Sequence, residues 1–335
     1  MTDVLVKEIE MLRDNQLTRR DAIKTGTLGA ASIALAGCFT QAARARAKES
    51  PKTEGWIDAH SHIWTRDVEN FPLAEGQTVD DLKPASFTAE ELIETARGEG
   101  VDRVVLIQHH IYHGWDNSYL VGAATRFPDK FRVVGMVDDT KTNPGNKMRM
   151  MLKYRVTAFR ITSLIRGGDN WLTGDGMSQM WRTGAETQQA MCCLINPEDT
   201  IAVDGMCQRF PDTPVVIDHF ARIGMTGEIA GSDLDNLCRL ARHKNTSVKI
   251  SAYYALGQKQ PPYTDMIPMI RRLLDVFGPE RLMWASDSPY QIDGDHTYGA
   301  SIGLIRDRLD GLSDGDREWL LCGTAKKVFF YDVAG

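Results

Sequence analysis

The sequence predicts an α/β protein built as a single (β/α)8 barrel, and three observations support this fold class. Short apolar runs of β-forming residues alternate with amphipathic helical segments from residue 56 to near the end of the chain. Eight such strand-like runs occur, which is the number that closes a barrel. No glycine-rich phosphate-binding loop follows an early strand, which argues against the alternative of an open doubly wound sheet.

The expected strands and helices follow one another in regular order. The strand-like runs lie at residues 56–60, 103–108, 132–137, 157–161, 191–195, 214–218, 247–251 and 282–286. Helices are expected at residues 88–99, 117–127, 197–209, 232–244 and 263–277. Thr88 and Glu91 have the spacing of a capping box, which begins a helix, and Pro128 and Pro279 end helices. Strands that are apolar along their whole length indicate a parallel sheet with both faces covered.

The composition is that of an ordinary globular protein. The 335 residues are 42% hydrophobic and 25% charged, with a formal net charge of −6. A mildly acidic chain without basic runs is not expected to bind nucleic acid. No stretch reaches the roughly 18 apolar residues of a spanning helix, so an integral membrane protein is not expected. The six cysteines lack the paired CxxC spacing of a zinc site, and the chain is too long and too poor in cysteine for a disulfide scaffold.

The N-terminal segment has the features of an export signal. Arg19 and Arg20 form a twin-arginine pair, and an Ala/Gly-rich apolar run follows at residues 25–37. The letters LAGC, which end at Cys38, resemble a lipoprotein box in which the cysteine is acylated. The letters ARA, which end at Ala47, offer a competing cleavage site. Both alternatives predict a protein that leaves the cytoplasm.

These features divide the chain into three parts. Residues 1–37 are predicted to be a twin-arginine signal peptide, residues 38–54 a polar tether, and residues 55–335 one catalytic barrel. The expected location is the periplasm, either free or anchored to the membrane as a lipoprotein. Membrane contact is expected only through a lipid on Cys38.

Polar residues at the ends of three expected strands form the candidate catalytic centre, because barrels of this type carry their chemistry at the carboxyl ends of the strands. His60 and His62 end the first strand on the same side, since side chains alternate along a strand. His219 ends the sixth strand and Asp287 ends the eighth. The ordinary alternatives are an incidental pair in a loop for His60 and His62 and a satisfied core histidine for His219. Three imidazoles and a carboxylate together instead indicate water activation, with Asp287 as a general base, as a metal ligand or as both in turn.

Four further residues are candidates for substrate binding. Arg160 lies within the apolar fourth strand, where a cation needs an anionic partner from either the protein or the substrate. Gln108 and His109 end the second strand, and Tyr253 follows the seventh. These positions are expected to face the same barrel mouth as the catalytic residues.

Four segments carry a resemblance to a known family. The segments IDAHSHIW, VVIDHFARIG, RLMWASDSPY and GTAKKVFF resemble the amidohydrolase-related (amidohydrolase type 2) proteins, and within them the sugar-lactonase and 2-pyrone-4,6-dicarboxylate hydrolase branch. The likeness runs from about residue 56 to residue 330. It implies a (β/α)8 fold and hydrolysis of a lactone or a similar ester. The matching residues are His60, His62, Arg160, His219 and Asp287.

The chain departs from the metal-binding pattern of this superfamily at two strands. A histidine usually ends the fifth strand, but this chain has Asn196 there, and no bridging Lys or Glu is evident on the fourth. A two-metal site is therefore not expected. One divalent ion, most readily zinc, on His60, His62 and Asp287 is one alternative, and a metal-free site is the other. The KISAYY segment also differs from the KLSG ending of the lactonase branch.

Three functions follow from these observations. The first is a hydrolase of a lactone or related cyclic ester of a sugar acid or carboxylic acid, in which Asp287 activates a water within the His60, His62 and His219 cluster. The second is a zinc-dependent decarboxylase of the same superfamily, which requires a tightly held metal ion. The third is a non-catalytic, carbohydrate-binding lipoprotein. All three have a small molecule as partner.

Overall fold

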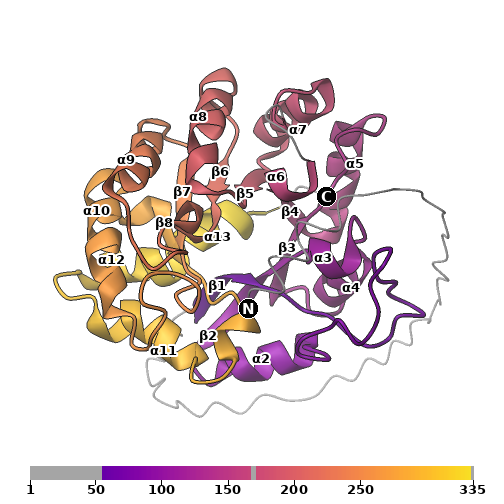
Figure 1. The fold of residues 1–335 in the computed structure, drawn as a ribbon. Coiled ribbons are helices and arrows are strands. Elements are labelled where there is room, and N and C mark those ends of the chain that lie inside the picture. Colours follow the sequence, from indigo (N-terminus) through magenta and orange to yellow (C-terminus); the bar gives the residue numbers. More distant parts are fainter. Residues whose placement is uncertain (1–54, 167–170, 333–335) are drawn as a thin grey trace, which may run out of the picture.

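A barrel of eight parallel strands forms the centre of the computed structural model, which describes residues 55–166 and 171–332 (Figure 1). The strands are β1 (Trp56–Ser61), β2 (Val101–Ile107), β3 (Phe131–Gly135), β4 (Val156–Ile161), β5 (Ala190–Cys193), β6 (Val215–Ile217), β7 (Thr246–Ile250) and β8 (Leu282–Trp284). Each strand is hydrogen-bonded to the next in sequence order. The predicted fold class is confirmed, and every expected strand overlaps an observed one. The signal, lipoprotein box and tether predicted for residues 1–54 lie outside the described residues.

The backbone of the candidate catalytic residues closes the barrel between its first and last strands. Ser61 and Ser288 form a parallel bridge. The amide of His62 donates to the carbonyl oxygen of Ser288 at 2.8 Å, and the amide of Asp287 donates to that of His60 at 2.8 Å. The seam of the barrel therefore holds two imidazoles and the carboxylate side by side.

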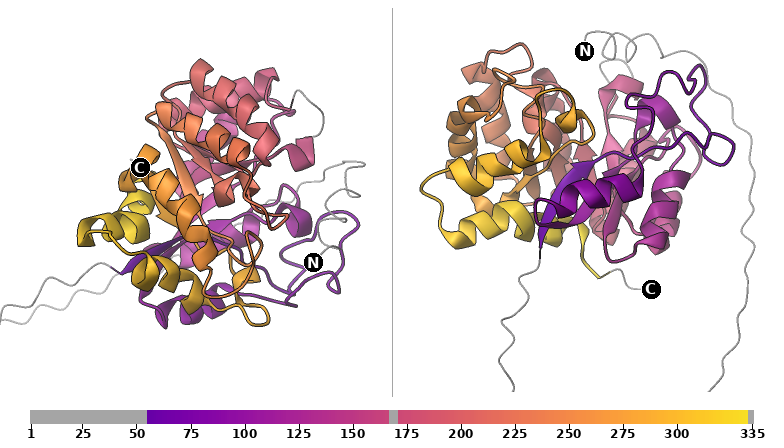
Figure 2. Two further views of the ribbon diagram at one scale, coloured as in Figure 1. Left: turned by 60° about the vertical axis from the view of Figure 1, so that its left-hand side comes forward. Right: turned by 90° about the horizontal axis from the view of Figure 1, so that it is seen from below.

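An outer ring of helices covers the strands (Figures 1 and 2). The helices are α2 (Ala89–Arg97), α3 (His110–His113), α4 (Ser118–Arg126), α5 (Pro144–Met151), α6 (Ser163–Arg166), α7 (Asp175–Thr187), α8 (Thr200–Arg209), α9 (Gly231–Arg239), α10 (Ile267–Phe277), α11 (Tyr298–Gly303), α12 (Asp314–Glu318) and α13 (Thr324–Phe329). Thr88 and Glu91 form the predicted capping box at the start of α2. Within the described part of the chain, no helix is long and apolar enough to cross a bilayer.

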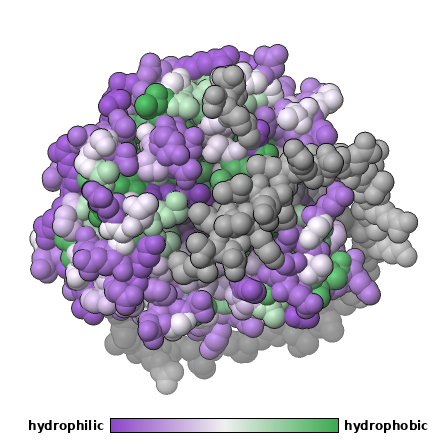
Figure 3. Space-filling view, in the orientation of Figure 1, coloured by the Kyte–Doolittle hydropathy of each residue, from purple (hydrophilic) through white to green (hydrophobic). Residues whose placement is uncertain are grey.

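Two apolar cores hold this architecture together. The larger core lies between the strands and the surrounding helices, and its members include Leu92, Trp181 and Leu273. The smaller core fills the barrel interior with inward-facing residues such as Val105, and Phe329 of α13 packs against it. Hydrophilic residues dominate the face shown in Figure 3, as expected when the apolar stripe of each helix is turned inward.

Candidate active site

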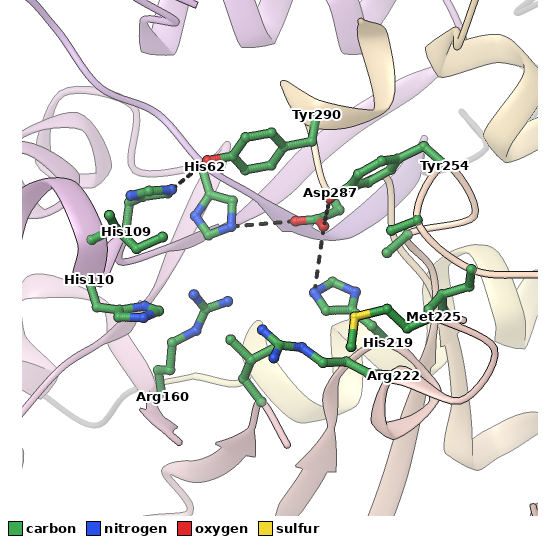
Figure 4. Close-up of a pocket in the computed structure, with 15 residues that line it drawn as sticks. His62, His109, His110, Arg160, His219, Arg222, Met225, Tyr254, Asp287 and Tyr290 are labelled. Carbon is green, nitrogen blue, oxygen red and sulfur yellow. Dashed lines mark hydrogen bonds and ion pairs between the residues drawn. The ribbon is translucent and has the colours of Figure 1, made fainter. Parts of the chain in front are cut away.

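The candidate catalytic residues converge at the carboxyl ends of the strands. His60 Nε2 lies 3.5 Å from Asp287 Oδ1, and His62 Nε2 lies 3.4 Å from the same oxygen. His219 Nε2 lies 3.8 Å from Asp287 Oδ2. All four side chains are buried, and Figure 4 shows His62, His219 and Asp287 pointing toward a common space. Segments more than 200 residues apart in sequence thus supply one cluster around one carboxylate.

An unusual backbone turn presents His219. It belongs to a run of four residues with φ between 49° and 59° in the left-handed region, which also contains Phe220, Ala221 and Arg222. Each non-glycine residue in this conformation costs roughly 1–2 kcal/mol. Asp287 is also left-handed, with a φ of 65°. Strain of this kind persists where the surrounding structure imposes it, and it is concentrated at functional sites.

A hydrogen bond fixes the tautomer of His62. Its Nδ1 lies 2.9 Å from the carbonyl oxygen of Ile107, which can only accept, so Nδ1 carries a proton. Burial lowers the pKa of His62 below its usual 6.5, so the ring is neutral near neutral pH and Nε2 is an acceptor. This acceptor faces the Asp287 carboxylate. A group that contacts both must donate two hydrogens or carry positive charge, as water or a metal ion does.

The charge states suit general-base catalysis. Burial alone would raise the pKa of Asp287, but the imidazoles of His219, His62 and His60 hold it well below its usual 3.8. Burial lowers the pKa of His219 to about 4 and holds that of His60 well below its usual 6.5. At neutral pH an ionised carboxylate is therefore surrounded by neutral imidazoles, which is the state that a base for water requires.

A buried ion pair lies beside the imidazoles, inside the barrel. Lys249 Nζ on β7 is 3.0 Å from Asp218 Oδ1 and 3.2 Å from His60 Nδ1. Both charged side chains are fully buried. Burial alone would raise the pKa of Asp218, but Lys249 and His60 hold it well below its usual 3.8. Sequence reasoning missed Lys249, although a lysine within an apolar strand was the signal that could have identified it.

Arg160 lies on the other side of His60. Its NH2 group is 3.0 Å from His60 Nε2, whereas the nearest contact to Asp218 is 4.0 Å. Its NH1 group donates to the Gln108 carbonyl oxygen at 3.5 Å. The side chain also lines the cavity. The Asp218 carboxylate is at the distance limit of an ion pair, so the Arg160 guanidinium can still bind an anion of the substrate.

A cavity of about 200 Å³ adjoins the cluster and has two chemically different walls. Arg160 and Arg222 project from one wall, opposite Tyr254 and Tyr290 (Figure 4). Most of the remaining lining is apolar, and it includes Ile111, Leu194, Met225 and Leu256. Sequence reasoning did not identify Arg222, Tyr254 or Tyr290.

Two tyrosines contact the polar cluster. The Tyr254 hydroxyl donates to Asp287 Oδ2 at 2.7 Å, and the Tyr290 hydroxyl lies 2.6 Å from His109 Nε2. His109 lines the cavity, as expected from its place after the second strand. Both tyrosines and His109 therefore lie within reach of a molecule bound beside Asp287.

Two residues expected to bind substrate lie elsewhere. The Gln108 amide group donates to the carbonyl oxygen of Asp116, and the Tyr253 hydroxyl donates to that of Ile250 at 2.8 Å. Neither side chain is part of the cavity lining. The structure places Tyr254 at the cavity where sequence reasoning placed Tyr253.

Three side chains could hold a metal ion. Among the described residues, His60, His219 and Asp287 each offer one ligand atom, and these atoms lie within 4.8 Å of one another. This set differs from the sequence expectation by replacing His62 with His219. Two imidazoles and a carboxylate fit one divalent ion of the zinc type in number and chemistry. The Arg160 guanidinium competes for His60 Nε2, so binding through that nitrogen requires Arg160 to withdraw.

The chain belongs to the amidohydrolase family, whose model matches residues 57–331. It is 27% identical over 250 residues to an L-fucono-1,5-lactonase from Burkholderia ambifaria, a match covering 73% of this chain and 84% of the relative. It is 24% identical over 251 residues to a 4-sulfomuconolactone hydrolase from Rhizobium radiobacter, covering 73% and 80%. Membership of this family, with lactone-hydrolysing relatives, makes the protein an enzyme of the hydrolase class.

Solved structures share the fold. A putative 2-pyrone-4,6-dicarboxylic acid hydrolase from Pseudomonas putida superimposes with a TM-score of 0.70 at 23% identity, covering 84% of this chain and all of that one. A zinc-bound amidohydrolase from Burkholderia multivorans superimposes with a TM-score of 0.67 at 19% identity, covering 83% and 99%. At these identities the likeness supports the barrel fold.

Proposed function

We propose that the protein hydrolyses a lactone that carries an anionic substituent, with Asp287 as the general base. The observation that carries this proposal is the Asp287 carboxyl group, which has an imidazole nitrogen of each of three histidines within 3.4–3.8 Å at the side of a cavity. The lactone-hydrolysing relatives support the reaction type.

The arrangement of donors and acceptors supports the following steps. A water held by Asp287 Oδ1 and His62 Nε2 attacks the lactone carbonyl carbon and gives its proton to Asp287. The tetrahedral intermediate then collapses, the bond from the carbonyl carbon to the ring oxygen breaks, and the proton held by Asp287 passes to the released ring oxygen. The Arg160 guanidinium, which can only donate, stabilises the developing oxyanion. General-base and oxyanion contributions are each worth roughly 10²–10⁴ in rate.

The lining of the cavity supports an anionic substrate over a neutral sugar. Arg222 supplies a guanidinium group that matches a carboxylate or a sulfonate, while Arg160 serves the oxyanion. Ile111, Leu194 and Met225 offer no hydrogen bonds to the several hydroxyls of a sugar lactone. A carboxylated or sulfonated lactone with an apolar or unsaturated ring therefore fits better than a polyhydroxylated one.

A metal ion on His60, His219 and Asp287 would act as a Lewis acid on the lactone carbonyl. The steps above use only side chains of the protein. The zinc-dependent decarboxylase requires such an ion, and the curated relatives named above are lactone hydrolases. The carbohydrate-binding alternative leaves the buried, ionised base without a role.

Hydrolysis of a lactone panel by the wild type and by Asp287→Asn tests this function. The panel contains 2-pyrone-4,6-dicarboxylate, 4-sulfomuconolactone and L-fucono-1,5-lactone, and ring opening is followed by acid release. The wild type is expected to open an anionic lactone, and the variant to lose at least about 100-fold in kcat/KM. Asp204→Asn on α8 is the matched control and keeps activity. Near-normal turnover by Asp287→Asn refutes the proposed base.

We also propose that the protein is exported by the twin-arginine route and retained in the periplasm or on the membrane. The pair Arg19 and Arg20, followed by the apolar run and by Cys38, supports this. Replacing both arginines with lysine is expected to leave the full-length chain in the cytoplasm. Cell fractionation measures this, and unchanged export of the double variant contradicts the route.

A further inference from the structure

The cavity beside Asp287 is lined by a buried imidazole that has no hydrogen bond. His110 is the first residue of α3, only 9% of its surface is exposed, and it lines the cavity. Its Nδ1 is buried without a hydrogen-bond partner, and the ring makes no hydrogen bond to any residue that the structure describes. Because buried polar side chains normally have partners, an unpartnered one at a cavity indicates a group that enters the cavity.

The charged side chains around His110 favour an anion as that group. Burial, reinforced by the positive charges of Arg160 and Arg222, holds the pKa of His110 well below its usual 6.5. The ring is therefore neutral and keeps one N–H, for which the described residues offer no acceptor. An acceptor that approaches this N–H also approaches the two guanidinium groups, so a negatively charged acceptor is favoured over a neutral one.

Arg222 also lacks an anionic partner. Its NH1 group donates to the neutral Asn196 Oδ1 at 3.3 Å, and no carboxylate of the described residues forms an ion pair with it. Arg160, by contrast, contacts His60 Nε2 at 3.0 Å. Figure 4 shows His110, Arg160 and Arg222 on the same wall of the cavity. A substrate anion on this wall can therefore contact both Arg222 and His110.

The remaining polar side chains of the lining already have protein partners. Tyr254 donates to Asp287, and Tyr290 contacts His109. The three other histidines contact the Ile107 carbonyl oxygen in the case of His62, the Tyr112 amide in that of His109 and the Ser251 hydroxyl in that of His219. Within the described part of the lining, His110 is thus the polar side chain without a hydrogen bond.

We propose that His110 and Arg222 form the subsite that binds the anionic substituent of the lactone, with His110 as its buried hydrogen-bond donor. This role rests on the proposed lactone hydrolysis and assigns the recognition of its substrate to particular residues. The imidazole N–H donates to one oxygen of a carboxylate or sulfonate, and the Arg222 guanidinium donates to another. No bond forms or breaks in this subsite, so it contributes to substrate binding rather than to the chemical step.

Two lactones that differ only in the charge of one substituent test this subsite. One is δ-valerolactone with a carboxylate on the carbon next to the ring oxygen, and the other carries a carboxamide of nearly the same shape there. His110→Phe keeps a flat ring but removes the N–H. We expect the KM of the carboxylate to rise roughly 10- to 100-fold and that of the carboxamide less than about 5-fold. The kcat for both should change little, because the contact is present before and during ring opening.

Further variants separate recognition of the anion from a structural role. His110→Gln keeps an N–H and is expected to retain most of the preference for the carboxylate. Arg222→Met should raise the KM of the carboxylate at least as much as His110→Phe does. The two changes combined should raise it by less than the product of the separate increases, because both act on one substituent. Arg182→Met on α7, outside the cavity lining, is the matched control and has wild-type KM for both lactones.

The outcomes distinguish this subsite from the proposed function itself. Equal increases in KM for the two lactones in His110→Phe, unchanged KM for both, or a wild type that prefers the carboxamide overturn the subsite while lactone hydrolysis stands. A wild type that opens no lactone overturns both proposals. Circular dichroism shows whether each variant has folded. If His110→Phe does not fold, Arg222→Met, at a partly exposed residue, tests the same subsite.

Discussion

The interior of the barrel has two halves that differ in chemistry. In the half that faces α13, small and branched apolar residues such as Ile57 and Val105 pack with Phe329. In the half that faces the cavity, His60, Asp218 and Lys249 are fully buried beside Asp287. Burying an apolar side chain stabilises a protein by roughly 1.5–3 kcal/mol, whereas burying a charge costs several kcal/mol unless it is well paired.

Lys249 lies at the boundary between these halves. Its Nζ is 5.3 Å from the centroid of the Phe329 ring on one side and 3.0 Å from Asp218 on the other. The apolar half therefore supplies stability, and part of that stability offsets the cost of burying the charged groups that hold His60 in place. Changes in the charged half should therefore alter both stability and activity.

The largest effect is expected for Lys249→Met. Removing one member of a buried ion pair leaves Asp218 as an unpaired buried charge, which costs roughly 3–5 kcal/mol. Loss of the contact to His60 Nδ1 should also lower kcat. Urea unfolding measures the stability and lactone turnover measures the activity.

A second variant separates the two consequences of that change. Lys249→Met combined with Asp218→Asn removes both charges, so most of the lost stability should return while kcat stays low. If the double variant recovers activity together with stability, the ion pair has no role in positioning His60. If Lys249→Met alone has wild-type stability, leaving Asp218 unpaired does not cost the protein free energy of folding, and the interpretation of the charged half is wrong.

A somewhat smaller effect is expected on acidification. The pKa of His219 falls from 6.5 in the unfolded chain to about 4 in the folded protein, so between these values the unfolded state binds more protons. The contribution of His219 to the free energy of unfolding is therefore complete above pH 6.5. It is lost as the pH falls toward 4, and the loss amounts to at most about 3 kcal/mol. Urea unfolding across this pH range measures the loss.

A histidine variant locates the source of this pH dependence. His219→Asn should reduce the slope of stability against pH between pH 4 and 6.5. An unaltered slope in His219→Asn would show that burial does not hold the imidazole neutral.

The strands were predictable because each is a short apolar run, whereas some helices were hidden by their glycines. Helices α5 and α7 were not expected. Gly145 and Gly184 look like helix breakers, yet a Cβ at Gly145 would lie 2.4 Å from Thr183 Oγ1, and one at Gly184 would lie 2.7 Å from the Gln189 carbonyl oxygen. These glycines allow close packing, which a sequence pattern does not reveal.

The convergence of His60, His62, His219 and Asp287 was predictable because these residues lie at or just beyond the carboxyl ends of strands, but the loop residues of the cavity were not predictable. Ala252 has a φ of 59°, and this left-handed residue breaks the alternation that continues from β7. As a result Tyr254, and not Tyr253, faces the cavity. Arg222 likewise reaches the cavity only through the left-handed turn after β6.

The hydrogen bonds that join β1 to β8 have a consequence for biosynthesis. They require the backbone of His60 and His62 to meet that of Asp287 and Ser288. Most of the domain separates these two segments in sequence. The ribosome must therefore release nearly the whole polypeptide before the barrel can close. The twin-arginine pathway proposed for this chain carries folded cargo, so translocation would have to wait for that final pairing.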